Sequence, residues 1–280
     1  MKVHHLNCGT MHPAGGKLID GEPGLLRRAE LVAHCLLIET GDSLVLVDTG
    51  FGTQAVARPR EWLGGFFLAA VGARLEAAET AVAQIKALGL DPADVRHVIA
   101  THLDVDHAGG LADFPNAVVH VRAEERRSAT APANAAEKNR YRAAQFAHRP
   151  LWSTYEETGE PWFGFDAVRA LKGLPEEILL VPLPGHTRGH AGVAVDTGDG
   201  WLLHAGDAYF FHGQLDPVAP HCPPGLTAFQ TLVQTVRGPR LENLARLHEL
   251  ARTHRDDVTV FSAHSPVELA AVRRKSPGTE

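Results

Sequence analysis

Short apolar runs alternate with turn residues along most of the chain, and this alternation predicts many short strands. Gly41 and Asp42 separate the runs "HCLLIET" and "SLVLVDTG", so residues 34–49 are predicted to form a hairpin of two strands. Further strands are expected in the apolar runs at 94–102, 117–125, 177–186, 192–198, 200–207 and 258–264.

Two stretches have helical spacing instead. Residues 79–90 place apolar side chains three and four positions apart and end at Gly89, and residues 226–253 are predicted to form two helices separated by a Gly-Pro break. The strands therefore come in two batches, each followed by helices. This order predicts two packed sheets with helices outside them, an α/β four-layer αββα sandwich in a single domain over residues 1–280.

Residues 124–165 have a different character from the rest of the chain. They begin polar and alanine-rich, and they end with several aromatic side chains. We interpret them as a helical insert within the domain. Its aromatic residues either bury their own stripe against the core or form the wall of a substrate pocket; they are Trp152, Tyr155, Trp162, Phe163 and Phe165.

Composition excludes several classes of protein. Hydrophobic residues make up 44% and charged residues 21% of the 280 positions, as in ordinary globular proteins, and a net charge of -6 argues against nucleic-acid binding. The N-terminus lacks the apolar run of a signal peptide, and no stretch approaches the ~20 apolar residues that span a bilayer. Cys8, Cys35 and Cys222 are too scattered for a disulfide framework, so a cytoplasmic location is expected.

The 17 histidines are the outlier, and several of them stand with carboxylates directly after apolar strands. Loops at strand ends can project ligands from a rigid scaffold into one cleft. A single histidine such as His264 is usually a core or surface residue, and "HAGD" alone is a weak signal. Four such segments in succession indicate a metal site, and the set exceeds what one tetrahedral ion needs. Its members are His102, Asp104, Asp106, His107, His186, Asp207 and His264.

These segments resemble a known family. The motifs "VDTGFG", "THLDVDHAGG", "PGHTRGH", "GDAYF" and "SAH" follow the order of those in the metallo-β-lactamase superfamily, over residues 31–267. The resemblance implies an αββα sandwich with two metal ions at one edge of the sheets. The "HAGGL" continuation and the "PGHTRGH" loop look most similar to the N-acyl-homoserine lactonase-like branch.

The resemblance also implies a role for each ligand. One metal would be held by His102, the residue at position 104, and His186. The other would be held by Asp106, His107 and His264. Asp207 would bridge the two ions, and Asp48 would support the site by orienting a ligand or its loop. Zinc is the first choice for both divalent ions, and iron or manganese are the alternatives.

Asp104 departs from the family, which usually has histidine at this position. If Asp104 is a ligand, three carboxylates and a hydroxide balance two divalent ions, whereas histidine would leave a net charge of +1. The carboxylate would then make a weaker Lewis acid and shift the preference toward iron or manganese. Alternatively Asp104 is too short to reach, and the first metal is loose or absent. We favour the ligand interpretation.

The leading functional hypothesis is a metal-dependent hydrolase of a lactone or related ester, in which a metal-bridging hydroxide attacks the carbonyl carbon. Asp106 or Asp104 could carry a proton to the leaving group. Tyr209 is a candidate donor to the carbonyl oxygen, although the lactonases' tyrosine usually lies one position later, where this chain has Phe210. Packing is the alternative role for Tyr209.

Three other functions stay open. A redox enzyme with two irons could use carboxylate-rich ligands on the same fold, although its relatives usually carry a flavin domain. A phosphodiesterase would need cations near the metals, and Arg188 is the obvious one. A non-catalytic metal-binding module is the fourth hypothesis. The expected partner is a small-molecule substrate, with neither nucleic acid nor membrane, and the oligomeric state stays open, a homodimer included.

Overall fold

The structure is a computed structural model, and it describes residues 1–41 and 43–275. Within this part of the chain the strands form two sheets, one of seven strands in the order β4-β1-β2-β3-β5-β6-β7 and one of six in the order β13-β12-β11-β10-β9-β8. The strands are β1 (Lys2–Met11), β2 (Leu31–Glu39), β3 (Leu44–Val47), β4 (Ala73–Arg74), β5 (Val95–Ile99), β6 (Val118–Arg122), β7 (Leu151–Tyr155), β8 (Glu160–Trp162), β9 (Phe165–Ala170), β10 (Ile178–Pro182), β11 (Ala191–Asp196), β12 (Trp201–His204) and β13 (Val258–Phe261).

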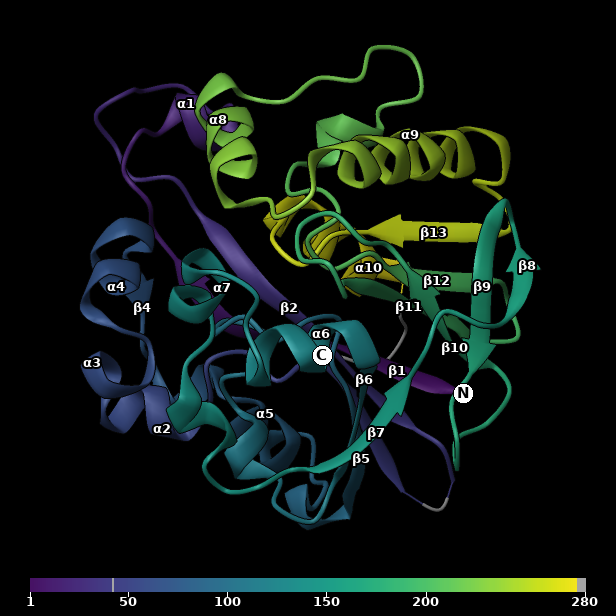
Figure 1. The fold of residues 1–280 in the computed structure, drawn as a ribbon. Coiled ribbons are helices and arrows are strands. Elements are labelled where there is room, and N and C mark those ends of the chain that lie inside the picture. The colour runs from purple at the N-terminus through teal and green to yellow at the C-terminus, as the bar shows by residue number, and fades with distance from the viewer. Residues whose placement is uncertain (42, 276–280) are drawn as a thin grey trace.

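Helices cover the outer faces of both sheets (Figure 1). The α-helices are α1 (Lys17–Asp20), α2 (Gly52–Ala57), α3 (Pro59–Trp62), α4 (Gly65–Val71), α5 (Ala81–Ala87), α6 (Ala123–Thr130), α7 (Ala135–Arg140), α8 (Pro224–Val233), α9 (Arg237–Thr253) and α10 (Pro266–Lys275). Short 3-10 helices are η1 (Ala77–Glu79), η2 (Pro92–Asp94), η3 (Leu111–Asp113), η4 (Ala143–Phe146) and η5 (His212–Leu215).

The core is divided into layers that confirm the predicted sandwich. Apolar side chains such as Ile38 of the first sheet and Val193 of the second meet in one fully buried cluster between the sheets. On the outer face of the first sheet, Ile85 of α5 packs against the strands. On the outer face of the second sheet, Leu247 of α9 does the same. The order α5, sheet, sheet, α9 is therefore that of an αββα sandwich.

The predicted hairpin and helix pair are both present. Strand β2 pairs antiparallel with β3, and Gly41 between them has a positive φ of 89°; Asp42 lies outside the described residues. The break between α8 and α9 falls at residues 234–236 rather than at the Gly-Pro pair. Gly238 and Pro239 instead lie in the first turn of α9, where proline is tolerated because that turn's N–H groups need no intrahelical acceptor.

The expected insert at 124–165 is helical only as far as Phe146. Residues 151–155 instead form β7, which pairs in parallel with β6 and extends the first sheet, and residues 160–162 form β8 at the edge of the second. Trp152 packs on Phe146, and Trp162 packs against Trp201. Aromatic side chains fit the half-buried face of a strand as readily as a helical stripe, which explains the wrong prediction.

No helix in residues 1–41 and 43–275 is long and apolar enough to cross a membrane.

Candidate metal centre

The four ligand-bearing loops leave the two sheets at the same edge. Strand β5 leads into the loop that carries His102 to His107, and β10, β12 and β13 lead to His186, Asp207 and His264. Strand β3 runs parallel to β5, and β12 runs parallel to β13, so their carboxyl ends point the same way. The fold therefore brings all seven predicted ligand residues together.

Asp207 stands between two groups of nitrogen ligands. Its Oδ2 lies 3.2 Å from Nε2 of His186 and 3.8 Å from Nε2 of His102, which form the first group. Its Oδ1 lies 3.1 Å from Nε2 of His107 and 3.0 Å from Nε2 of His264, which form the second group. Each oxygen of one carboxylate thus faces a different group, which is the arrangement of a bridging ligand.

Asp106 completes the second group. Its Oδ2 lies 3.7 Å from Nε2 of His264 and 4.0 Å from Nε2 of His107. The candidate ligand atoms of His102, His186 and Asp207, and those of Asp106, His107 and His264, form two sets that are each compact enough for one ion. The resemblance implied the same second set, whereas for the first it implied His102, Asp104 and His186, with Asp207 as the bridge.

One orphaned polar atom indicates that this donor set suits metal ions. Nε2 of His102 is buried and has no hydrogen-bond partner in the described residues. A buried polar atom without a partner costs free energy, and a coordinated cation would satisfy it. Imidazole nitrogens with carboxylate oxygens are typical ligands of zinc and neighbouring transition metals.

Asp48 holds the second group in place from behind. It is fully buried with a positive φ of 57°, and it accepts hydrogen bonds from the Thr101 backbone N–H (2.8 Å) and hydroxyl (2.7 Å) and contacts Nδ1 of His107 (2.8 Å). Burial alone would raise the pKa of Asp48, but the nearby imidazoles, His107 first among them, together lower it. Asp48 is therefore ionised and holds Nδ1–H of His107, so that Nε2 is the nitrogen turned toward the ligand position.

The backbone holds His264 in the same way. Nδ1 of His264 donates to the carbonyl oxygen of Val32 at 2.8 Å, so Nε2 is the nitrogen that faces Asp207. Both histidines of the second group are therefore oriented with Nε2 toward the ligand position before any ion binds.

Two further supports were not identified from the sequence. His190 donates from Nδ1 to the Leu183 carbonyl (2.9 Å) and accepts at Nε2 from the backbone N–H of Asp207 (2.9 Å), which positions the bridging residue. Buried Glu125 accepts from the Leu103 backbone N–H (2.9 Å) and the Thr187 hydroxyl (2.6 Å), so it ties two ligand loops together. His190 belongs to the "PGHTRGH" motif, whereas no local pattern points to Glu125.

Asp104 faces the first group but is shared with an arginine. Its Oδ2 lies 3.1 Å from Nε2 of His186 and 3.4 Å from Nε2 of His102, close enough to contribute to that group. Arg140 of α7 binds both oxygens of Asp104, with Nε 2.6 Å from Oδ1 and Nη2 2.5 Å from Oδ2. Burial would raise the pKa of Asp104, yet the Arg140 guanidinium holds it well below its usual range.

The same guanidinium reaches the ligand atom of His186. Nη2 of Arg140 lies 2.5 Å from Nε2 of His186, and Nη1 donates to the Val233 carbonyl at the end of α8 (2.7 Å). A lone pair that accepts from Arg140 cannot coordinate a metal at the same time. Arg140 and a metal ion therefore compete for His186, and no sequence motif predicts this competition.

The polar groups of Tyr209 and Arg188 are both paired with glutamates. Tyr209 is fully buried, and its hydroxyl donates to Oε1 of Glu268 at 2.8 Å, which favours the packing role. The neighbouring Phe210 is the residue at the metal centre, with its ring centroid 5.8 Å from that of His186 and 4.8 Å from that of His264. Arg188 is paired with Glu137 at 2.8 Å.

Comparison with known proteins identifies the class of this chain. Residues 28–231 match the Metallo-beta-lactamase superfamily. A probable metallo-hydrolase of Mycobacterium tuberculosis is 44% identical over 266 residues, which cover 95% of this chain and 81% of that protein. The chain belongs to the metallo-beta-lactamase superfamily, a family of metallo-hydrolases.

Lactonases are among its relatives. The N-acyl homoserine lactonase AiiA of Bacillus thuringiensis subsp. kurstaki is 27% identical over 192 residues, covering 66% of this chain and 68% of that one. A B. thuringiensis AiiA mutant with bound N-decanoyl-L-homoserine has a TM-score of 0.67 and 21% identity, covering 96% and 95% of the two chains. AidC, a dizinc quorum-quenching lactonase, has a TM-score of 0.59 and 17% identity, covering 94% and 87%. These relatives confirm the predicted fold and the lactonase-like resemblance.

Proposed function

We propose that this protein is a binuclear metal-dependent hydrolase that opens lactones or cleaves closely related esters. The observation that carries the proposal is Asp207, whose two oxygens each face a separate group of histidine nitrogens at 3.0–3.8 Å. The similarity to lactonases in sequence and fold supports the choice of substrate. The substrate is a small molecule in this proposal.

The proposed first metal is held by His102, His186 and Asp207, with Asp104 as a further ligand when Arg140 releases it. The proposed second metal is held by Oδ1 of Asp207 together with Asp106, His107 and His264. Zinc is the proposed ion because the donors are mostly imidazole nitrogens, and a structural relative is a dizinc lactonase. Such ions polarise a carbonyl oxygen and lower the pKa of bound water.

The chain's own residues divide the remaining tasks. Asp104 is held ionised by Arg140, so it is a poor carrier of a proton to the leaving group. Asp106, whose carboxylate is free of any arginine in the described residues, takes that role in the proposal. Phe210 forms an apolar wall beside His186 and His264, and this wall excludes water from the reacting ester.

The cations of the site disfavour phosphate as the substrate. Arg188 is paired with Glu137, and Arg140 is paired with Asp104 in this structure, so neither cation is presented unpaired to a phosphodiester. We place the protein in the cytoplasm in this proposal, because Cys8, Cys35 and Cys222 are free thiols.

A substrate panel on the metal-loaded protein tests the proposal. Acyl-homoserine lactones, aryl esters, thioesters, bis-aryl phosphates and β-lactams are compared by proton release or absorbance, with elemental analysis of the same preparation. We expect lactone opening that chelation abolishes and added metal restores, with one to two ions per chain. Full activity without metal would contradict the metal assignment, and turnover of phosphates with inert lactones would establish the phosphodiesterase instead.

A further inference from the structure

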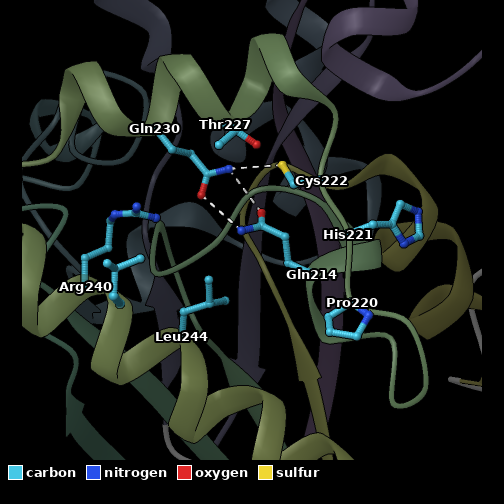
Figure 2. A pocket seen from close by; sticks show the side chains of 9 residues that line it. Gln214, Pro220, His221, Cys222, Thr227, Gln230, Arg240 and Leu244 are labelled. Carbon is cyan, nitrogen blue, oxygen red and sulfur yellow. Dashed lines mark hydrogen bonds between the residues drawn. The ribbon is translucent and has the colours of Figure 1, made fainter.

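A cavity of about 250 Å³ lies between the η5 segment, α8 and α9, outside the metal centre (Figure 2). Its lining includes the apolar side chains of Pro220, Leu241 and Leu244. It also includes the amides of Gln214 and Gln230 together with Arg240. A cavity that combines an apolar wall with a few convergent polar groups is typical of small-molecule sites.

Arg240 is the unusual member of this lining. It is 8% exposed, and among the residues that the structure describes its one side-chain hydrogen bond runs from Nε to Oε1 of Gln234 at 2.6 Å. Within the described residues it forms no ion pair, and burial together with the nearby cation of Arg237 lowers its pKa. A buried charge without a counter-ion is costly, so the fold keeps this guanidinium at a cost that a bound anion would offset.

The amides beside Arg240 are preorganised. Gln214 and Gln230 donate to each other, with Nε2–Oε1 distances of 3.3 and 3.1 Å, and Oε1 of Gln214 also accepts from the backbone N–H of Phe210 at 3.1 Å. In Figure 2 the Arg240 side chain points from α9 toward the Gln230 amide. These hydrogen bonds hold the polar end of the cavity in place. Gln214 also connects it to the backbone of Phe210, whose ring contacts His186 and His264.

We propose that this cavity binds a small organic carboxylate, with the carboxylate on Arg240 and a short apolar chain along Leu244 and Pro220. The single buried guanidinium matches one negative charge in a planar, two-oxygen group. A volume of about 250 Å³ is that of a small-molecule cavity, so a short-chain carboxylate such as hexanoate is a suitable probe.

Calorimetry and thermal unfolding on the metal-loaded full chain test the site with four probes: hexanoate, hexanol, hexylamine and inorganic phosphate. We expect saturable binding of hexanoate and a rise in its presence of the unfolding midpoint, with neither effect from hexanol or hexylamine. Phosphate binding that depends on Arg240, with hexanoate inert, would overturn the carboxylate assignment.

Arg240→Met removes the charge and keeps a side chain of similar shape. We expect hexanoate affinity to fall roughly tenfold or more, and the unfolding midpoint of the unliganded protein to stay level or rise. The exposed Arg237→Met is the matched control and should keep affinity within about twofold. Leu244→Trp fills the cavity while retaining Arg240, and it should also abolish binding. Undiminished hexanoate binding in both Arg240→Met and Leu244→Trp would overturn the proposal.

A carboxylate could instead bind the metal ions, and cobalt-substituted protein separates the two sites. Hexanoate in the cavity should leave the visible cobalt spectrum unchanged, whereas coordination to cobalt would shift it. A shifted spectrum with binding that survives Arg240→Met would place hexanoate at the metals and overturn the cavity assignment. Because the affinity test depends on Arg240 and needs no turnover, a failure of the proposed hydrolase would not affect it.

Discussion

The two ligand groups contain the same kinds of donor, but they differ in what surrounds them. In the second group, His107 and His264 are each held at Nδ1 by Asp48 or the Val32 carbonyl, and their Nε2 atoms face Asp207. In the first group, Nε2 of His186 is already contacted by the guanidinium of Arg140. The difference teaches that the neighbours of a ligand matter as well as its donor type. We expect the second position to bind its ion more tightly than the first.

Arg140 also changes the charge count of the first group. If Asp104 is counted without Arg140, the formal charges of two divalent ions, three carboxylates and a hydroxide add up to zero. The Asp104–Arg140 pair is neutral as a whole, as an uncharged imidazole would be, so the sum returns to the +1 expected with histidine. The aspartate is therefore a smaller electrostatic departure from the family than its residue type suggests.

Replacing the shared ligand should have the largest effect. Asp207→Ala removes the one side chain that faces both groups, so both positions should lose metal and hydrolysis should fall by roughly a thousandfold or more. Elemental analysis after dialysis and lactone turnover measure the two losses. The exposed Asp199→Ala is the matched control and should change neither. Retention of both ions in Asp207→Ala would refute the bridging role.

Separating Asp104 from Arg140 tests the first group alone. Arg140→Met removes a competing cation from His186, so affinity at the first position should rise about tenfold. Asp104→Ala leaves the cation without its partner, so this affinity should fall, and activity should drop about 10²-fold or more. Chelator competition with a metal-sensitive dye resolves the two positions.

The double variant and a surface control complete that comparison. Asp104→Ala combined with Arg140→Met should bind the first metal more tightly than Asp104→Ala alone, because no uncompensated cation remains. Arg127→Met, an exposed arginine, should match the wild type. If Arg140→Met lost metal, Arg140 would support the first position, and the contrast between the groups would fail. Unchanged metal binding in Asp104→Ala would refute Asp104 as a ligand.

The smallest expected effect concerns the support behind the second group. Glu268 accepts from the Ser262 backbone N–H (2.9 Å) and from Tyr209 (2.8 Å), which links the loops of His264 and Asp207. Burial raises the pKa of Glu268 from 4.5 to about 7. The folded state therefore holds this proton more tightly than the unfolded state, and the stability it contributes is present below about pH 4.5 and lost as the pH rises through about 7.

Glu268→Gln should remove this pH dependence. The free energy of unfolding of the wild type, measured relative to the variant in urea, should decline by about 1–3 kcal/mol between pH 4.5 and pH 7. A constant difference across that range would show that Glu268 titrates normally. Lactone turnover at fixed metal occupancy should change little, since Glu268 touches no predicted ligand.

That the candidate metal ligands lie together could be predicted from sequence because each follows an apolar strand within a short motif. His102 to His107 occupy one loop, and parallel strands fix where that loop points. Arg140 and Glu125 could not be predicted, because their partners come from distant segments and helical arginines and glutamates are common on surfaces. Arg240 was missed for the same reason: its burial depends on how α9 packs, which its own sequence does not encode.

The strands β7 and β8 show a different limit. Trp152 and Trp162 carry large apolar surfaces that either a helix or a strand could bury, and the local pattern does not separate the two. Pairing of β7 with β6, and packing of Trp162 on Trp201, decide the matter through contacts made only in the folded chain. Tertiary contacts here override local propensity.

The position of the ligands on both sheets has a consequence for folding. His107 and His264 come within 3.4 Å of each other although 157 positions separate them in the chain. Contacts between such distant segments form late, because the chain between them must first be ordered. The proposed second metal position therefore exists only in the assembled domain. An ion at that position, at a free concentration 100 times its dissociation constant, would add about 2.7 kcal/mol to the stability of the native state. Under the proposed function, metal supply would then affect the stability of the folded protein as well as its activity.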